Sequence, residues 1–495
     1  MSSSPLFAAL AARHPESLVF QGAHSSWRAR DVLTEISRIE ACLDGVRVLA
    51  ILADNSPDWA LTDLAALKAK TPVLPLPLFF SPAQLAHALE QTGADLVVTD
   101  QPERILSLGI GFSITEQRLN QTWMRRQVAP VTLPDGTAKI SYTSGSTGAP
   151  KGVCLSAEGL VDTAMALKSR LSDLRIERHL AVLPLALLLE NSAGVYAPLL
   201  RGAAIHLPPL ASLGWQGMAG FNPQSLQQMV TELRPNSLIL VPELLKAWAM
   251  LLSHSGQRAA DELVYVAVGG SRVEPGLLAL ARQLGVPAYQ GYGLTECGSV
   301  VSLNRPGDDG EGVGRPLPHV RAMIRGDEIH LASRAFLGYL GDTAYHAGTD
   351  YATGDLGHFD DAGHLYLSGR RKNLLITSFG RNISPEWVEA SLLAQPQIAQ
   401  AVVAGDSRPA LAAVVVPSPG VSYADVAAAI GRANASLPDY ARLGGWIDAG
   451  PFSLQNGMLT GNGRPVRSAI LDHYAAELAA LYDEQSIKEN THAFL

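Results

Sequence analysis

The segment YTSGSTGAPKGV, at residues 142–153, combines the residue types that bind polyphosphates. Glycine allows backbone N–H groups to approach an anion, hydroxyl groups donate hydrogen bonds, and lysine adds a positive charge. The residues concerned are Ser144, Gly145, Ser146, Thr147, Gly148 and Lys151. A Walker loop is excluded, because Lys151 is followed by Gly152 where that motif requires serine or threonine. These residues alone leave two alternatives, another kind of phosphate loop and a solvent-exposed turn.

A carboxylate suited to a metal ion follows later, in the segment GYGLTE at residues 291–296. Thr295 and Glu296 stand in a glycine-flanked turn after a predicted strand. Mg²⁺ takes oxygen ligands and commonly joins a carboxylate to substrate phosphates. Glu296 would therefore suit Mg²⁺ if this turn lies beside the phosphate loop, whereas the pair taken alone is equally compatible with a structural turn.

Further charged residues stand at turns in the last third of the chain. Asp355, in TGDLG, is predicted to lie in a tight turn, where it could bind both hydroxyls of a ribose or cap the turn itself. The segment SGRRKN places Arg370 and Lys372 at a basic junction, and Arg464 lies on a glycine turn in LTGNGR. Ser384, in NISPEWVE, is predicted to be the N-cap of a helix.

The elements around these residues predict an α/β fold. Between residue 17 and about residue 100, strand-like segments such as VRVLAIL (46–52) alternate with helical ones at 56–69 and 81–92. Such βαβ repetition indicates a largely parallel sheet. A second α/β stretch runs to about residue 300 and includes the strand-like HLAVLPL (179–185), and short strands then predict a small β subdomain up to residue 367. The remaining residues predict a compact α+β unit.

Bulk properties restrict the function classes further. The 495 residues are too many for one ordinary core, and 47% of them are hydrophobic. A net charge of −8 without a basic run argues against nucleic-acid binding. The three cysteines form no CxxC pair, so neither a disulfide framework nor a zinc site is expected. The N-terminus lacks the basic region of a signal peptide, and the most apolar run, at 180–189, is too short to span a bilayer, so the cytoplasm is the default location.

Taken together, the motifs resemble those of the adenylate-forming (AMP-binding) superfamily in order and spacing. That group includes acyl-CoA synthetases, luciferase and the adenylation domains of peptide synthetases. The matching segments are the glycine-rich loop, GYGLTE, TGD with GRRKN, FGRNISPEWVE and LTGNGR, and the resemblance extends from about residue 20 to about residue 475. GYGLTE followed by VVSLN, and RRKNLLITSFGRNISPEWVE, are most similar to long-chain fatty acyl-CoA synthetases.

The resemblance implies three parts: an N-terminal AMP-binding domain over residues 1–368, a hinge at 369–373, and a small mobile C-terminal domain over 374–495. It also implies that the hydroxyls, glycines and lysine of the loop bind the departing phosphates of ATP. Tyr292 would stack on adenine, with Gly269 and Gly270 along the nucleotide and acyl pocket. Thr295 would contact the α-phosphate, and Glu296 would hold Mg²⁺.

The remaining implied roles concern the hinge and the C-terminal domain. Asp355 would bind the ribose hydroxyls with help from Arg370, and Lys372 would be the hinge residue. Gly380 would line the tunnel for the thiol after the C-terminal domain has rotated. Arg464 would bind the substrate carboxylate and the α-phosphate during adenylation.

The implied activity is the ATP-dependent conversion of a carboxylic acid, fatty or otherwise apolar, to an acyl-adenylate and then to a thioester. The cofactors would be ATP, Mg²⁺ and coenzyme A or a phosphopantetheine. Two alternatives stay open: an acyl-AMP ligase that loads an acyl carrier protein, and a catalytically silent protein that binds acyl-adenylates.

Two positions depart from the family pattern. Arg464 replaces the usual lysine, and a guanidinium is a bulkier, planar group than an ammonium. Leu187 occupies the place of a histidine in many relatives, which makes the expected acyl pocket more apolar, although plain core packing explains a leucine equally well.

Overall fold

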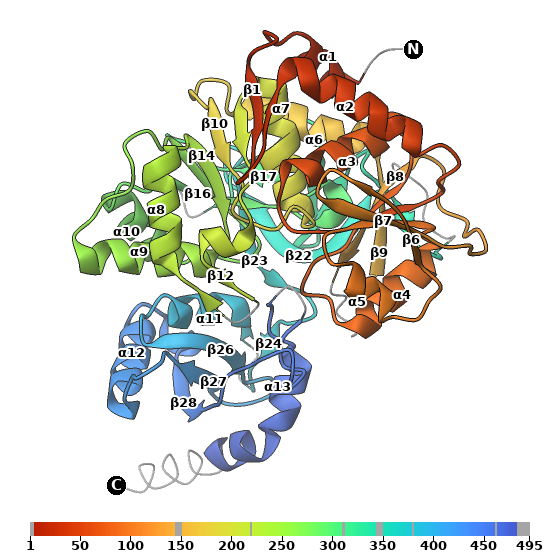
Figure 1. Ribbon diagram of the computed structural model, residues 1–495. Coiled ribbons are helices and arrows are strands. Elements are labelled where there is room, and N and C mark those ends of the chain that lie inside the picture. Colours follow the sequence, from red (N-terminus) through yellow and green to blue (C-terminus); the bar gives the residue numbers. More distant parts are fainter. Residues whose placement is uncertain are drawn as a thin grey trace, which may run out of the picture.

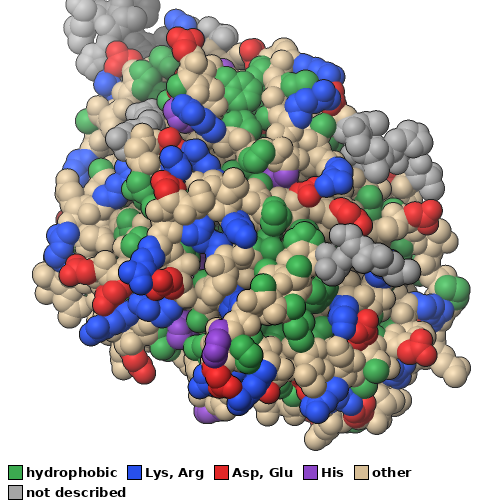
Figure 2. Space-filling view, turned by 90° about the horizontal axis from the view of Figure 1, so that it is seen from above, with side chains coloured by type: hydrophobic (Ala, Val, Ile, Leu, Met, Phe, Trp, Pro, Cys, Tyr) green, Lys and Arg blue, Asp and Glu red, His purple; other side chains and the backbone are tan. Residues whose placement is uncertain are grey.

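The computed structural model describes residues 4–143, 151–217, 220–308, 312–342, 350–378, 381–460 and 463–482. A large N-terminal part stands above a small C-terminal part in Figure 1. This arrangement, with mixed α/β layers in the larger part, confirms the predicted fold class. On the face shown in Figure 2, basic and acidic side chains are interspersed.

Two large sheets form the N-terminal part. The first has nine strands, whose order is β18 (Arg315–Pro316), β17 (Ser302–Leu303), β16 (Ala288–Tyr292), β15 (Tyr265–Val268), β14 (Ser237–Leu240), β10 (Arg178–Leu180), β11 (Ala204–His206), β1 (Leu18–Gln21) and β2 (Ser26–Arg28). Its six strands from β16 to β1 are parallel, as the βαβ pattern predicts.

The second sheet has eight strands and mixed direction. Its order is β21 (Phe336–Tyr339), β9 (Lys151–Ser156), β8 (Thr137–Thr143), β4 (Val73–Pro75), β3 (Leu49–Leu52), β5 (Leu96–Thr99), β7 (Gln121–Arg125) and β6 (Ser113–Arg118). β8 and β9 form an antiparallel pair on either side of the glycine-rich loop.

Helices lie between and around these sheets (Figure 1). They are α1 (Pro5–Ala11), α2 (Ala29–Cys42), α3 (Pro57–Ala69), α4 (Pro82–Thr92), α5 (Pro102–Leu106), α6 (Ala157–Arg170), α7 (Ala197–Arg201), α8 (Pro223–Leu233), α9 (Pro242–Ser255) and α10 (Pro275–Gln283). α3 is buried almost all round, with Trp59 and Leu64 fully inaccessible. Together with α6 and both sheets it forms one large apolar core.

Helices α3 and α4 begin within one residue of the starts predicted from the sequence. The Ser56 hydroxyl accepts the Trp59 N–H at the start of α3, and Ser81 forms a capping box with Gln84 at the start of α4. Gly93 ends α4 in a left-handed conformation, at φ 64°.

The strand expected at 179–185 ends early, at Leu180. The backbone groups of Leu183 and Leu185 instead bind the side chain of Asn55. Its amide donates to the Leu183 carbonyl at 2.8 Å and accepts the Leu185 N–H at 2.7 Å. The chain then enters a π-helical segment, η1 (Glu190–Tyr196).

A small β subdomain connects the two parts. Its antiparallel strands are β19 (Arg321–Arg325), β20 (Glu328–Ala332), β22 (Tyr351–Phe359) and β23 (Leu365–Arg370). Asp355 therefore lies within a strand and not in the predicted tight turn. The turn-like conformation is confined to Gly354, whose φ is 74°, and the register of β22 shifts just after Asp355.

The C-terminal part is a separate α+β unit with its own core. It contains β26 (Ile398–Ala404), β27 (Leu411–Pro417), β28 (Leu443–Asp448), α11 (Pro385–Leu393), α12 (Tyr423–Ala435) and α13 (Arg467–His473), besides the short pair β24 (Leu375–Ile376) and β25 (Asn382–Ile383). Ser384 precedes α11 as predicted, but its hydroxyl donates to the Glu386 carboxylate instead of capping a backbone N–H.

Candidate active site

Tyr292, Asp355 and Arg370 lie together where the nine-stranded sheet meets the small β subdomain. The Tyr292 hydroxyl donates to Oδ2 of Asp355 at 2.7 Å, and Nε of Arg370 lies 2.7 Å from Oδ1. Burial raises the pKa of Tyr292, and the Asp355 charge raises it further, so the hydroxyl remains a donor. Asp355 is buried and thus fixed from both sides by residues that the sequence singled out for nucleotide binding.

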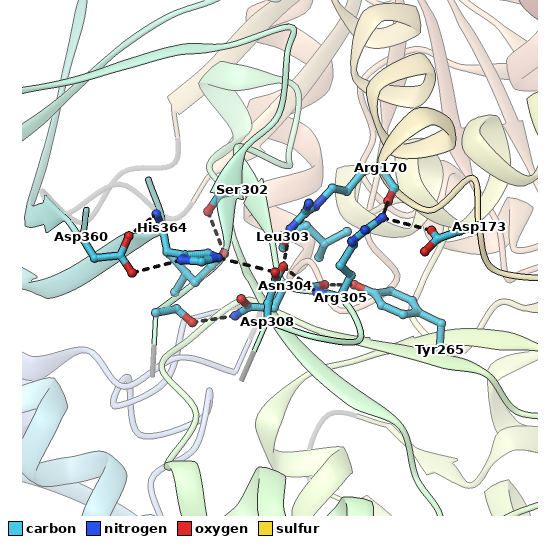
Figure 3. Close-up of polar contacts among 12 residues, drawn as sticks. Arg170, Asp173, Tyr265, Ser302, Leu303, Asn304, Arg305, Asp308, Asp360 and His364 are labelled. Atoms are coloured by element: carbon cyan, nitrogen blue, oxygen red, sulfur yellow. Dashed lines mark hydrogen bonds and ion pairs between the residues drawn. The ribbon is translucent and has the colours of Figure 1, made fainter. Parts of the chain in front are cut away.

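A polar network holds the supporting elements together (Figure 3). His364, after the β22–β23 turn, lies between Asp360 at 3.0 Å and Asp308 at 3.5 Å. Arg170, at the end of α6, forms an ion pair with Asp308 and donates to the Leu303 carbonyl at 3.2 Å. The contacts tie α6 and the loop after β17 to the β22–β23 hairpin, which carries Asp355 and Arg370.

Arg464 enters this region from the C-terminal part. Its guanidinium donates to the Gly270 carbonyl at 2.6 Å. The side chain keeps solvent-accessible surface, although protein atoms crowd its guanidinium. This burial lowers the pKa of Arg464, and the charge of Arg370 lowers it further. The structure therefore brings Arg464, Gly270, Asp355 and Arg370 to one place from both parts of the chain.

Glu296 and Lys151 both contact one tyrosine, Tyr339. The Tyr339 hydroxyl donates to Oε1 of Glu296 at 2.9 Å, and Nζ of Lys151 lies 5.3 Å from the centroid of the Tyr339 ring. The Tyr351 hydroxyl is 3.4 Å from the same carboxylate oxygen. Burial, and then the Glu296 charge, raise the pKa of both tyrosines, that of Tyr351 to about 12, so both hydroxyls are protonated at neutral pH.

The Glu296 carboxylate fits a Mg²⁺ ion. It is only 9% exposed, and it lies in the short 3₁₀ helix η3 (Thr295–Cys297), at whose start Thr295 is half-buried. Within the described part of the chain, no three His, Cys, Asp or Glu side chains are grouped as a metal cage. Mg²⁺ is commonly held by one or two carboxylates with substrate phosphates and water, and a single carboxylate meets that requirement.

The two glycines expected along the acyl pocket lie near apolar side chains. A Cβ atom on Gly269 would lie 3.6 Å from the Leu189 side chain, and one on Gly270 would lie 3.5 Å from Val241. Gly270 has φ 100°, a conformation that favours glycine. Leu187 is half-buried in the segment that precedes η1.

The junction between the two parts contains one glutamate that the motifs did not reveal. Glu328 accepts the Gly354 N–H at 2.8 Å and pairs with Arg371 at 2.9 Å, next to the exposed Lys372. Gly369 is required there, because a Cβ atom would lie 2.6 Å from Cβ of Ser384.

Some of the predicted site residues lie outside the described ranges, and three residues that contact the site were not predicted. The predicted site residues outside the described ranges are Ser144, Gly145, Ser146, Thr147, Gly148 and Gly380. The residues missed are Tyr339, Tyr351 and Glu328. Tyr339 and Tyr351 stand in the unremarkable segments FLGYLGD and DYATGD, and only their contacts with Glu296 distinguish them.

Two domain families match the chain. Residues 7–332 match the AMP-binding enzyme family, and residues 372–486 match the AMP-binding enzyme C-terminal domain. The first match alone covers well over half of the chain. The protein therefore belongs to the AMP-binding enzyme family, as the resemblance of its motifs predicts.

Individual relatives are acid–CoA ligases. The chain is 24% identical to long-chain-fatty-acid–CoA ligase 6 of Homo sapiens, over 90% of this chain and 79% of the relative. It is 30% identical to 2-succinylbenzoate–CoA ligase of Lactococcus lactis subsp. lactis, over 72% and 76% of the two chains. Together with the family match, these relatives support acid–CoA ligase as the class of enzyme.

The fold also matches solved structures. O-succinylbenzoate coenzyme A synthetase from Bacillus subtilis, in complex with ATP and magnesium ion, superposes with a TM-score of 0.73 at 21% identity, covering 94% of this chain and 98% of that one. At this identity the likeness concerns the fold. Among the described residues, none of the helices is long and apolar enough to cross a membrane.

Proposed function

We propose that this protein uses ATP to convert a carboxylic acid to an acyl-adenylate and then transfers the acyl group to the thiol of coenzyme A. The observation that carries the proposal is the contact of Arg464 with Gly270, because it joins the two parts of the chain beside Asp355 and Arg370. The roles that the motif resemblance implies would bring a nucleotide and a carboxylate together here.

The reaction has two displacement steps. In the first, a carboxylate oxygen attacks the α-phosphorus of ATP, forming the C(O)–O–P linkage, while the bond to the bridging oxygen of pyrophosphate breaks. In the second, the sulfur of coenzyme A attacks the acyl carbonyl, AMP leaves with the bridging oxygen, and the thiol proton passes to solvent. Both steps depend mainly on positioning and on charge neutralisation.

The described residues divide these tasks. Arg464 would orient the carboxylate and the α-phosphate, with Thr295 beside that phosphate. Asp355 would bind the ribose hydroxyls, Tyr292 would stack on adenine, and Lys151 would face the departing phosphates. Mg²⁺ bound at Glu296 would neutralise charge on the phosphates of ATP.

The boundaries of the two domains and of the hinge are also part of this proposal. Residues 1–368 would form the AMP-binding domain, and residues 374–495 would rotate about the hinge at 369–373, which contains Lys372. Rotation would withdraw Arg464 after adenylation and bring Gly380 toward the acceptor thiol. The contact between Glu328 and Arg371 spans this junction and would have to rearrange.

An apolar acid is the proposed substrate. Leu187 removes a polar group from the expected pocket, and Leu189 packs against Gly269 where the acyl chain would enter. Hydrophobic pockets select acids by size and apolar surface. The relative named for long-chain fatty acids supports an apolar acyl group, whereas 2-succinylbenzoate, after which another relative is named, is a dicarboxylate.

The test is acid-dependent exchange of pyrophosphate into ATP. We expect exchange with medium- or long-chain fatty acids, weaker exchange with aryl and dicarboxylic acids, and none without acid or Mg²⁺. Addition of coenzyme A should then consume thiol and release AMP in equal amounts. No exchange with any acid would reject the proposal. Exchange followed by transfer only to a holo-carrier protein would show that the acceptor is a carrier protein and not coenzyme A.

A further inference from the structure

Tyr339 contacts both the cation and the carboxylate on which the proposed adenylation depends. Its ring faces Lys151, and its hydroxyl donates to Glu296. The strand register explains this position: Tyr339 of β21 pairs with Val153 of β9, and Lys151 is two residues before Val153 on the same face of the sheet. One side chain thus contacts both functional groups.

Lysine and glutamate at neighbouring positions attract each other, and the attraction is strong where the glutamate is buried. Even so, the described residues include no ion-pair partner for Lys151 or for Glu296. Each group contacts Tyr339 instead, Lys151 at the face of the ring and Glu296 at the hydroxyl. Without Tyr339, a direct pair would neutralise the charges that ATP phosphates and Mg²⁺ require.

We propose that Tyr339 is a positioning residue that separates Lys151 from Glu296 and orients both toward MgATP. The inference rests on the proposed function. The ring keeps the lysine charge on its face through a cation–π contact, while the hydroxyl fixes one carboxylate oxygen. The two charges stay close enough to act on one ligand without pairing with each other.

A second tyrosine supports the orientation of the carboxylate. The hydroxyls of Tyr351 and Tyr339 are 2.9 Å apart, and both contact Oε1 of Glu296. The hydrogen bonds to Glu296 from described side chains all end on Oε1, which leaves Oε2 as the oxygen to face a metal ion. Phe336 packs edge-on against both rings, at centroid distances of 5.1 and 5.4 Å, and holds them in place.

The experiment uses two substitutions that separate the two contacts. Tyr339→Phe removes the hydroxyl and keeps the ring, whereas Tyr339→Leu removes both. Tyr423→Phe is the matched control, because Tyr423 is 63% exposed on α12 and outside the site. The dissociation constant of β,γ-imido-ATP is measured calorimetrically with Mg²⁺ and with EDTA for each full-length protein.

We expect Tyr339→Phe to raise the dissociation constant about tenfold with Mg²⁺, the scale of one hydrogen bond to a charged group, and to change it little in EDTA. Tyr339→Leu should raise it in both conditions, because Lys151 then pairs with Glu296. Combining Tyr339→Leu with Glu296→Gln should restore much of the affinity in EDTA.

Each contrary outcome has a distinct meaning. If Tyr339→Phe matches Tyr423→Phe in both conditions, the orientation of Glu296 by Tyr339 is rejected. If Tyr339→Leu leaves binding in EDTA unchanged, the separation of the charges is rejected. If the unmodified protein binds MgATP analogue and Tyr339→Phe weakens it as expected, but no acid supports pyrophosphate exchange, the proposed reaction fails while the inference on Tyr339 stands.

Discussion

Arg464 replaces a lysine of the family pattern, and its geometry shows how a guanidinium can serve there. A guanidinium has five N–H donors in a rigid plane, whereas an ammonium is a compact point charge. One donor of Arg464 is used on the Gly270 carbonyl, which anchors the side chain to the N-terminal part. The remaining edge of the plane is suited to a carboxylate or a phosphate.

Arg464→Ala should therefore separate the two half-reactions. We expect acyl-adenylate formation to fall by about 10²-fold or more, the scale of one lost preorganised charge contact. The same variant, supplied with pre-formed acyl-adenylate, should transfer the acyl group to coenzyme A at a near-normal rate. Rapid-quench measurement of each step checks this, and equal losses in both steps would contradict rotation of the C-terminal part.

Arg464→Lys tests the substitution itself. If the site is built around the planar guanidinium, adenylation falls, because lysine cannot hold Gly270 and the substrate at once. A gain in the adenylation rate would instead show that arginine is a compromise at this position.

Lys151→Ala should lower kcat for adenylation far more than it raises KM for the acid. Charge on the departing phosphates grows toward the transition state, and Lys151 is the cation of the loop segment TSGSTGAPKG. Steady-state kinetics with varied acid and ATP check this. A change confined to KM for ATP would assign Lys151 to nucleotide binding alone.

At the level of single residues, motifs could predict Glu296, Asp355, Arg370 and Arg464 as candidates, because their types and spacing carry the chemistry. They could not predict Tyr339. Its role arises from the pairing of β21 with β9, strands far apart in the sequence, and no local pattern encodes such a contact.

Among the elements, the network of Figure 3 fixes the β22–β23 hairpin against α6. Arg170 and Asp308 are 16% and 14% exposed, so each would be left poorly solvated without the other. We expect Asp308→Ala to lower the free energy of unfolding by about 1–3 kcal/mol. Urea denaturation measures the change.

Asp173→Ala is the matched control, because Asp173 also contacts an arginine of this network but is 57% exposed. Its effect should stay within about 0.5 kcal/mol. Equal effects of the two substitutions would mean that Asp308 contributes no more than a surface ion pair.

Helix starts with serine caps, such as those of α3 and α4, were predictable because capping is a local interaction. The buried pair of Lys139 and Asp63 was not. Lys139 lies in β8, which the sequence presents as an ordinary strand, and its charge is compensated by a residue of α3. Such long-range compensation has no local signal.

Across the whole molecule, the two parts are also joined by Lys246 of α9. Its ammonium group donates to the carbonyls of Gln395 and Ile398, both at 2.8 Å, in the C-terminal part. Burial lowers the pKa of Lys246 to about 8, although Glu243 opposes the shift. Like the contact of Arg464 with Gly270, it joins the C-terminal part to the N-terminal part.

The free energy of unfolding should therefore depend on pH. Between about pH 8 and about pH 10.5, the unfolded chain binds a proton at Lys246 that the folded protein does not, so stability from this residue rises with pH. Relative to Lys246→Met, the unmodified protein should gain about 1–3 kcal/mol over this interval. Urea denaturation of both proteins as a function of pH checks it, and parallel pH profiles would contradict the assignment.

The most direct test of the central claim follows an oxygen atom. In the proposed reaction the acid keeps one carboxylate oxygen in the thioester and leaves the other on AMP. With acid labelled by ¹⁸O in both carboxylate positions, mass spectrometry should find one ¹⁸O in each AMP released and none in pyrophosphate. Unlabelled AMP, or label in inorganic phosphate with ADP as the nucleotide product, would contradict activation through an acyl-adenylate.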